Sequence, residues 1–356
     1  MNAPGLVDRP IDGRTLGADA LTAEFAFAAR QAGGTFERTY RIAGQNLCVR
    51  SAGASLLERL SPSIEHLRTG AAGEREHVVE IWDGRSTRRP PAPPGSDALP
   101  PAGIATSVGE TWRAIYQVGV RTLSVVDTAL DRSWYWAADA ATLPEWECST
   151  PLRHILHLWL ASRGVQFVHA GAVGRPSGGC LIVGKSGSGK STSTLATLGS
   201  ELLYAGDDYV GVSVTTGGAH VHSIYGCGKL ETAHVERFPE LQIEPRPERA
   251  GALQARRDKT IFYVRDTYPE QVTTGFPLKA IVVPRIAPAE TTQLSEIPLT
   301  AALKALVPST MFEIHAAGQS ALTTLARVAR SVPAYELRLG ADIDAIPDLL
   351  GLAIGP

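Results

Sequence analysis

Residues 178–199 read GGCLIVGKSGSGKSTSTLATLG, in which a short apolar run, a glycine-rich stretch and a helix-compatible run follow one another directly. The run around CLIV predicts a buried strand, and STSTLATLG predicts a helix. Between them, residues 184–191 match G-x-x-x-x-G-K-[ST]. Glycines let consecutive backbone N–H groups face phosphate oxygens, and the start of the helix adds the positive end of its dipole. The sequence therefore predicts a phosphate-binding loop between a strand and a helix.

The residue types within this loop predict separate roles. Lys190 supplies a mobile positive charge for the β- and γ-phosphates, and Ser191 supplies a hydroxyl ligand for Mg²⁺. We therefore expect ATP and Mg²⁺ as the bound groups. The residues expected to hold the nucleotide are Gly184, Ser186, Gly187, Ser188, Gly189, Lys190, Ser191 and Thr192.

Two adjacent carboxylates, Asp207 and Asp208, follow the next strand-like segment. Adjacent carboxylates repel each other unless a cation or a proton separates their charges. Beside a triphosphate, one of them can hold Mg²⁺ and the other can accept a proton from an attacking hydroxyl. The chemistry alone requires only that the pair divide these two roles. A solvated Asp-Asp turn is the alternative interpretation.

His169 lies in FVHAGAV, upstream of the loop. A lone histidine on a strand is more often structural than catalytic, so the residue alone gives no assignment. The other histidines show no metal-ligand spacing. Four cysteines stand far apart, without a CxxC pair, which disfavours a zinc site and a disulfide framework.

Composition excludes several classes of protein. The chain has 356 residues, a net charge of −2 and 44% hydrophobic residues, so it can form a core and has no global attraction to nucleic acid. No apolar run is long enough to span a membrane, and the N-terminal residues do not resemble a signal peptide, so we expect a cytoplasmic protein.

Asparagine occurs only at positions 2 and 46, so the guanine-reading NKxD motif is absent. HRD and DFG motifs of protein kinases are absent too. Of the 34 basic residues, only six are lysines, and none of these precedes Lys185.

The pattern along the chain predicts two domains. Residues 1–149 alternate as short strands after a helix at 20–30, which predicts a smaller, mainly β (α+β) module with an exposed proline-rich loop at 86–103. Residues 150–356 alternate strands with helices, which predicts an α/β domain with a central mixed sheet. We expect this domain to open with a helix that has Pro151 in its first turn. Further helices are expected at 299–306, 320–330 and 343–353.

The set VHAGAV, GKSGSGKST and AGDDYV resembles the catalytic domain of HPr kinase/phosphorylase, whose fold is related to phosphoenolpyruvate carboxykinase. Later runs, from IYGCGKL to VPAYELRLG, resemble the HPr-kinase-like peptide serine kinases of lasso-peptide gene clusters. The resemblance covers about residues 150–353. It implies that His169 lies near the transferred phosphate, that Asp207 holds Mg²⁺ with Ser191, and that Asp208 is the general base.

The resemblance also implies a further basic residue, for which Lys229, Arg257, Lys259 and Arg285 are candidates. The chain departs from HPr kinase/phosphorylase at two loop positions, where Lys185 and Thr192 replace glutamates. No RGLG stretch is present either. Phosphorylase activity and HPr as the acceptor therefore stay open.

We expect an ATP-dependent kinase that phosphorylates a hydroxyl, most simply a serine of a peptide or small protein. In this hypothesis the catalytic residues are Asp208, His169 and Lys190, and the N-terminal module binds the acceptor or covers the site. A kinase for an amino acid or sugar is an alternative. A second alternative is an ATP-binding switch without transfer, although a protein that only binds ATP needs no acidic pair. The sequence leaves open whether the chain forms a homo-oligomer.

Overall fold

The computed structural model describes residues 17–70, 76–85, 104–108, 111–238, 259–313 and 318–355. The proline-rich stretch predicted at 86–103 lies outside these residues, as does Arg257. The described chain divides into two compact units, residues 17–162 and 163–355. We expected the division at residues 149–150. It falls after Ser162 because the helix α4 (Arg153–Ser162) packs on a strand of the first unit.

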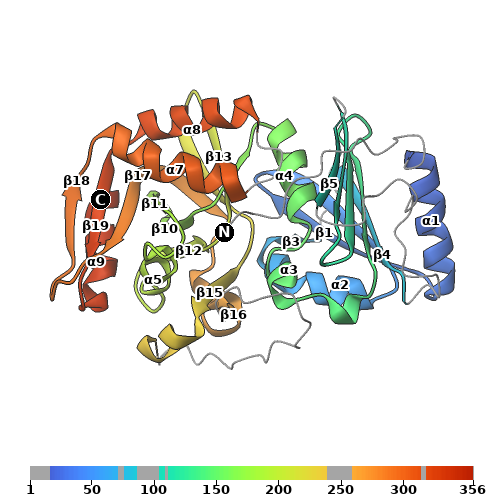
Figure 1. Cartoon of the computed structure of the whole chain (residues 1–356), viewed down its shortest axis with the longest axis horizontal. Coiled ribbons are helices and arrows are strands. Elements are labelled where there is room, and N and C mark those ends of the chain that lie inside the picture. The colour runs from blue at the N-terminus through green and yellow to red at the C-terminus, as the bar shows by residue number, and fades with distance from the viewer. Residues whose placement is uncertain are drawn as a thin grey trace. The chain divides into compact units, whose positions relative to one another are not determined.

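The second unit is built on a nine-stranded mixed sheet, which confirms the predicted α/β architecture. Its long strand β17 pairs in parallel with β11 and β19 and antiparallel with β14 (Figure 1). The strand order is β12-β10-β11-β17-β14-β13-β9, with β19 also paired to β17 and β18 to β19. The bounds are β9 Gln166–Val168, β10 Gly171–Arg175, β11 Gly178–Ile182, β12 Leu203–Gly206, β13 Val210–Thr215, β14 Gly218–Ser223, β17 Gly275–Ile286, β18 Gln293–Glu296 and β19 Ala334–Leu339.

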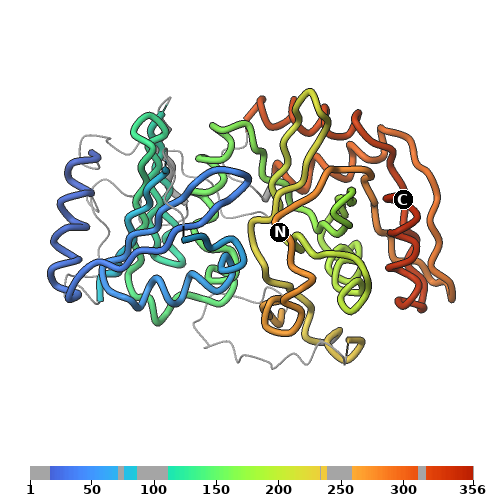
Figure 2. Tube along the Cα trace, turned by 180° about the vertical axis from the view of Figure 1, so that it is seen from behind, coloured from blue at the N-terminus to red at the C-terminus, as the bar shows by residue number. Residues whose placement is uncertain are grey.

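Helices cover both faces of this sheet because successive residues of its strands point to opposite sides. Leu181 and Val183 face α7 (Leu299–Glu313) and α8 (Gln319–Ser331), whereas Cys180 and Ile182 face α9 (Ile346–Ile354). Figure 1 shows α7 and α8 lying side by side along the sheet, and Figure 2 shows the same layers from behind. The central strands of the sheet therefore have helices packed on both faces.

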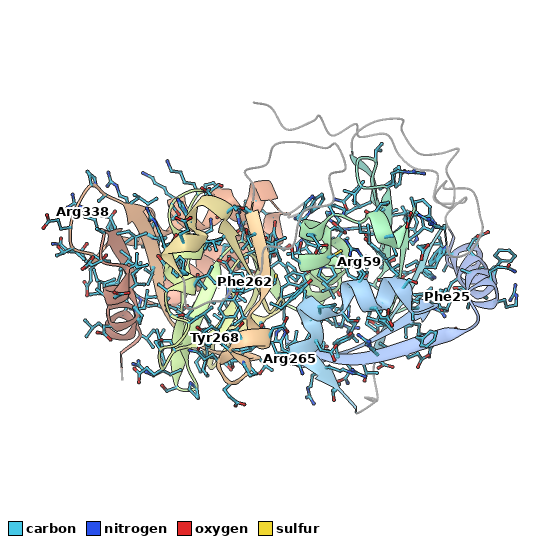
Figure 3. The ribbon with its side chains drawn as sticks, turned by 90° about the horizontal axis from the view of Figure 1, so that it is seen from below. Phe25, Arg59, Phe262, Arg265, Tyr268 and Arg338 are labelled. Carbon is cyan, nitrogen blue, oxygen red and sulfur yellow. The ribbon has the colours of Figure 1, made fainter. Side chains whose placement is uncertain are left out.

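A separate two-stranded ribbon completes the second unit. It pairs β15 (Cys227–Glu231) with β16 (Lys259–Tyr263) in antiparallel register. Leu230 of this ribbon packs in one cluster with Leu195 of α5 (Lys190–Leu195), the helix that follows the glycine-rich loop. Phe262 and Tyr268, labelled in Figure 3, lie at the edge of this cluster. The ribbon is thus anchored to the predicted nucleotide-binding helix.

The first unit is a mainly β module, as predicted. Its mixed sheet has the order β3-β1-β2-β4-β8-β7-β6-β5, and α1 packs on one face against Trp82, Trp134 and Trp136. Phe25 of α1 and Arg59 of α2 are labelled in Figure 3. The bounds are α1 Ala18–Gln31, β1 Thr35–Ile42, β2 Gln45–Ala52, α2 Ser55–Leu60, β3 Arg68–Thr69, β4 Glu76–Asp83, β5 Ile104–Val108, β6 Trp112–Gln117, β7 Thr122–Asp127, β8 Arg132–Ala137 and α3 Glu145–Ser149.

The start predicted for helix α4 is wrong. Pro151 precedes the helix, which begins at Arg153, because Leu152 has a φ of 55° and so lies in the left-handed region. A residue in that conformation cannot belong to a right-handed helix. The other predicted helices are present with shifted ends, and the last one is divided into a short 3₁₀ turn and α9.

Gly171, the first residue of β10, lets helix α5 lie against the sheet. A Cβ at Gly171 would stand 2.1 Å from the Thr194 hydroxyl oxygen. We therefore expect Gly171→Ala to lower the free energy of unfolding by about 1–3 kcal/mol, the usual cost of overpacking. Adding Thr194→Ala should restore most of this loss, because the nearest remaining atom is the Cβ of residue 194 at 3.3 Å.

Urea unfolding of the single and double variants checks this prediction. Gly318→Ala is the matched control, since a Cβ there would have no neighbour within 4 Å. A Gly171→Ala variant as stable as the parent chain would show that α5 is free to move.

Candidate active site

Three adjacent strands bring the predicted motifs to one edge of the sheet. β10 lies between β11 and β12 and is antiparallel to both, so β11 and β12 run in the same direction. The glycine-rich loop leaves the carboxyl end of β11, and the acidic pair leaves the carboxyl end of β12. His169 precedes β10, whose amino end lies at this same edge. Topology alone therefore gathers residues that are far apart in the sequence.

The glycine-rich loop has the backbone of a phosphate cradle. Gly184, Gly187 and Gly189 have φ values of 153°, 76° and 103°, which favour glycine at all three positions. At Gly189 space is also short, because a Cβ would stand 2.3 Å from Leu339 Cδ1. The buried Lys190 Nζ donates to the Gly184 carbonyl at 2.8 Å and lies 3.3 Å from that of Lys185. The ammonium group is thus folded back over the loop.

The serine and threonine side chains of the loop differ in exposure. Ser186 is exposed, whereas Ser191 and Thr192 are half-buried at the start of α5. Ser188 Oγ is buried and has no hydrogen-bond partner among the described residues. A buried hydroxyl group without a hydrogen-bond partner is unusual in a protein interior. The unpaired Ser188 hydroxyl is consistent with a loop whose polar atoms bind a ligand.

Asp207 is only 2% exposed. Its Oδ2 accepts a hydrogen bond from the Lys229 backbone N–H at 2.9 Å, while Oδ1 is buried without a partner among the described residues. Burial, together with the charge of Asp208, raises the pKa of Asp207, although the hydrogen bond from the Lys229 backbone N–H and the nearby Ser191 hydroxyl act in the opposite direction. A buried carboxylate oxygen beside a serine hydroxyl is a donor set that Mg²⁺ prefers, so these two side chains fit the expected metal.

The buried charge of Asp207 should therefore lower the free energy of unfolding when no metal is bound. We expect Asp207→Asn to raise the free energy of unfolding by about 1–3 kcal/mol at neutral pH, since a buried unpaired charge is removed. The native pKa is raised, so the parent chain loses stability as the pH rises through it. The advantage of the variant should shrink again in acid. Thermal unfolding with and without Mg²⁺ measures both effects.

In the same experiment, Mg²⁺ should raise the Tm of the parent chain and leave that of Asp207→Asn almost unchanged. Asp266→Asn, at an exposed position, is the control for loss of one negative charge. If Mg²⁺ stabilised the parent and the Asp207 variant equally, Asp207 would not be a metal ligand.

Asp208 contacts two basic side chains. Its Oδ2 lies 2.6 Å from Lys229 Nζ, and its Oδ1 lies 3.2 Å from His169 Nε2. Burial opposes ionisation of this carboxyl group, but Lys229 and His169 outweigh it and hold its pKa well below the usual range. Asp208 is therefore an anion at neutral pH, able to accept a hydrogen bond from a hydroxyl group.

His169 is fixed from both sides. Its backbone N–H faces Thr310 Oγ1 of α7 at 3.4 Å, and its ring lies 5.4 Å from that of Tyr209. Nδ1 is buried and has no partner among the described residues. The lone histidine is thus part of the acidic cluster rather than of a separate core. Thr310 was not predicted from the sequence, because nothing in its helix distinguishes it from a packing residue.

Of the four candidates for the further basic residue, the structure brings Lys229 into the cluster. Lys259 is exposed on β16, the strand that pairs with β15, and its charge lowers the pKa of Asp207. Arg285 is exposed and lies 3.9 Å from Glu336. Arg257 is outside the described residues. Lysine is scarce in this chain, so a lysine such as Lys229 is better explained by a specific role than by a contribution to solubility.

No family model matches this chain, and no curated protein matches it in sequence. Among solved structures, it is similar to the HPr(Ser) kinase/phosphatase of Coxiella burnetii. Identity is 10%, the match covers 53% of this chain and 93% of that one, and the TM-score is 0.27. No described helix combines the length and the apolar character needed to cross a membrane.

Proposed function

We propose that this chain is an ATP-dependent kinase of the HPr-kinase-like type that transfers the γ-phosphoryl group to a hydroxyl group. The observation that carries the proposal is the convergence at one sheet edge of a phosphate-binding loop, a buried carboxylate with an unpaired oxygen, and an ionised carboxylate beside a histidine. A protein that only binds nucleotide needs the first two of these features but not the third.

Each residue has a role that follows from its contacts. When ATP binds, the Lys190 ammonium group moves from the loop carbonyls to the phosphate oxygens. The phosphate oxygens bind it more strongly, because they carry a full negative charge whereas the carbonyls are only dipoles. Asp208 accepts the hydroxyl proton, and His169 stays beside the transferring group through its bond to Asp208. Ser191 and Asp207 would hold Mg²⁺, which neutralises charge on the phosphate oxygens when it is bound. Positioning and electrostatics then supply most of the rate, as in other phosphoryl transfers.

The proposed acceptor is a serine of a peptide or small protein. The first unit, residues 17–162, contains none of the residues of the candidate site described above. A peptide needs a surface of this kind, whereas an amino acid or a sugar can be held within a pocket. The resemblance of the motif set to peptide serine kinases points in the same direction.

Labelled ATP tests the function and the acceptor together. The purified chain is incubated with Mg²⁺, γ-labelled ATP and either a peptide fraction or a small-metabolite fraction of a cell extract. We expect label in phosphoserine of peptides, and none with Asp208→Asn. Label only in small metabolites would replace the peptide acceptor by the metabolite alternative. ATP binding without transfer or hydrolysis would leave the regulatory switch as the better interpretation.

A further inference from the structure

Lys229 donates to both members of the acidic pair. Its backbone N–H binds Asp207 Oδ2 at 2.9 Å, and its ammonium group binds Asp208 Oδ2 at 2.6 Å. His169 takes the other oxygen of Asp208. Within the part of the chain that the structure describes, Asp207 Oδ1 is the carboxylate oxygen of this pair that has no hydrogen-bond partner.

The fold holds Lys229 firmly in this place. It lies at the middle of β15, opposite Ile261 of β16, so its backbone N–H direction is set by the ribbon. The preceding residue, Gly228, packs closely, because a Cβ there would stand 2.5 Å from Phe262 and 2.9 Å from Leu195. The Lys229 side chain is only 9% exposed. Burying an ammonium group costs free energy, so its place beside Asp208 calls for a functional reason.

The two contacts have different consequences for the two carboxylates. A main-chain N–H carries no net charge, so it orients Asp207 and leaves that carboxylate able to bind a cation. The ammonium group forms an ion pair with the ionised Asp208, which makes that carboxylate a poor metal ligand and holds it toward His169. One residue thus gives two chemically identical neighbours unequal surroundings.

We propose that Lys229 is a positioning residue of the kinase site, which reserves Asp207 for the metal and Asp208 for the acceptor hydroxyl. This inference rests on the proposed function. It predicts that the side chain and the backbone of Lys229 act separately. Removing the side chain disturbs Asp208 alone, since every replacement except proline keeps the N–H that orients Asp207.

Lys229→Ala tests the inference by comparing kcat with two binding measurements. We expect kcat to fall about 10²-fold, as a displaced catalytic group costs in other enzymes. The KM for ATP and the rise in Tm caused by Mg²⁺ should stay within about twofold of the parent values, because Lys190, Ser191 and Asp207 are unchanged. Lys304→Ala, at an exposed position on α7, is the matched control.

Charge and shape are separated by two further measurements. Ethylammonium or propylammonium in solution should restore kcat of Lys229→Ala at least tenfold by filling the vacated space, and should not affect the parent chain. Lys229→Arg, which keeps the charge, should lose less activity than Lys229→Ala. Rescue by either route supports the inference.

Several outcomes would overturn it. An unchanged kcat in Lys229→Ala, or equal losses in the alanine and arginine variants without amine rescue, would show that Lys229 only packs. A lost Mg²⁺ response would show that its side chain serves the metal instead. A parent chain without transfer or ATP hydrolysis would reject the proposed function itself, whereas an active parent with an equally active Lys229→Ala variant would reject only the role of Lys229.

Discussion

Replacing Asp208 by asparagine should lower kcat about 10²–10⁴-fold, the usual cost of losing a general base. The amide keeps the size of the side chain but has no negative charge to attract the hydroxyl proton. It also weakens the contacts with Lys229 Nζ and His169 Nε2, which lie 2.6 Å and 3.2 Å from the carboxylate oxygens. Affinity for ATP should change less than about threefold, since none of these contacts involves the phosphate loop.

Steady-state kinetics and calorimetry with ATP and Mg²⁺ measure the two effects separately. Asp266→Asn, at an exposed position on the short helix α6 (Val264–Thr267), controls for the change in net charge. A comparison with Asp207→Asn is decisive. The Asp207 variant should require more Mg²⁺, whereas the Asp208 variant should be slow at every Mg²⁺ concentration. Full activity in both variants would remove the acidic pair from the mechanism.

The second large effect is expected at the phosphate loop. Lys190→Met should lower kcat/KM for ATP about 10²–10³-fold, as loss of one preorganised donor to a reacting group does in other enzymes. Methionine matches the length and apolar stem of the buried lysine, so the fold should persist. The substitution removes the ammonium contacts with the Gly184 and Lys185 carbonyls in the free protein. It also removes the charge that, in the proposed complex with ATP, would contact phosphate oxygens.

Circular dichroism and calorimetry show whether Lys190→Met folds and how it binds ATP. Lys279→Met, at an exposed position on β17, is the control for loss of a lysine. Parent-like turnover and affinity in Lys190→Met would mean that the loop binds no phosphate, and the kinase proposal would fail with it.

Local sequence predicted most elements of the fold, because their signals are local. Alternation in the first module and the strand–loop–helix order around Gly184 needed no knowledge of tertiary structure. β15 and β18 were not predicted, since both are short and their pairing partners lie far along the chain. The start of α4 was placed at Pro151, because a positive φ at Leu152 leaves no trace in residue type.

The site could be predicted in part for a similar reason. Residue types with one dominant chemistry, such as Lys190 and the acidic pair, were identified from their motifs. The family resemblance implied His169 and left Lys229 as one of four candidates. The structure explains why both lie beside Asp208, since the placement of β10 between β11 and β12, and of the ribbon on α5, brings them there. Which aspartate holds which partner depends on a hydrogen bond from a main-chain N–H, which no sequence pattern encodes.

The position of β17 in the sheet affects how the second unit folds during synthesis. This strand pairs with β11, β14 and β19, so a ribosome makes the phosphate loop and the acidic pair long before the strand that supports them. Contacts between distant segments form slowly, because the intervening chain must lose much of its freedom first. The nascent chain therefore carries the glycine-rich loop and the acidic pair without their supporting strand until residues 275–286 emerge. The proposed nucleotide binding should begin abruptly during synthesis once this strand has emerged, rather than growing with chain length.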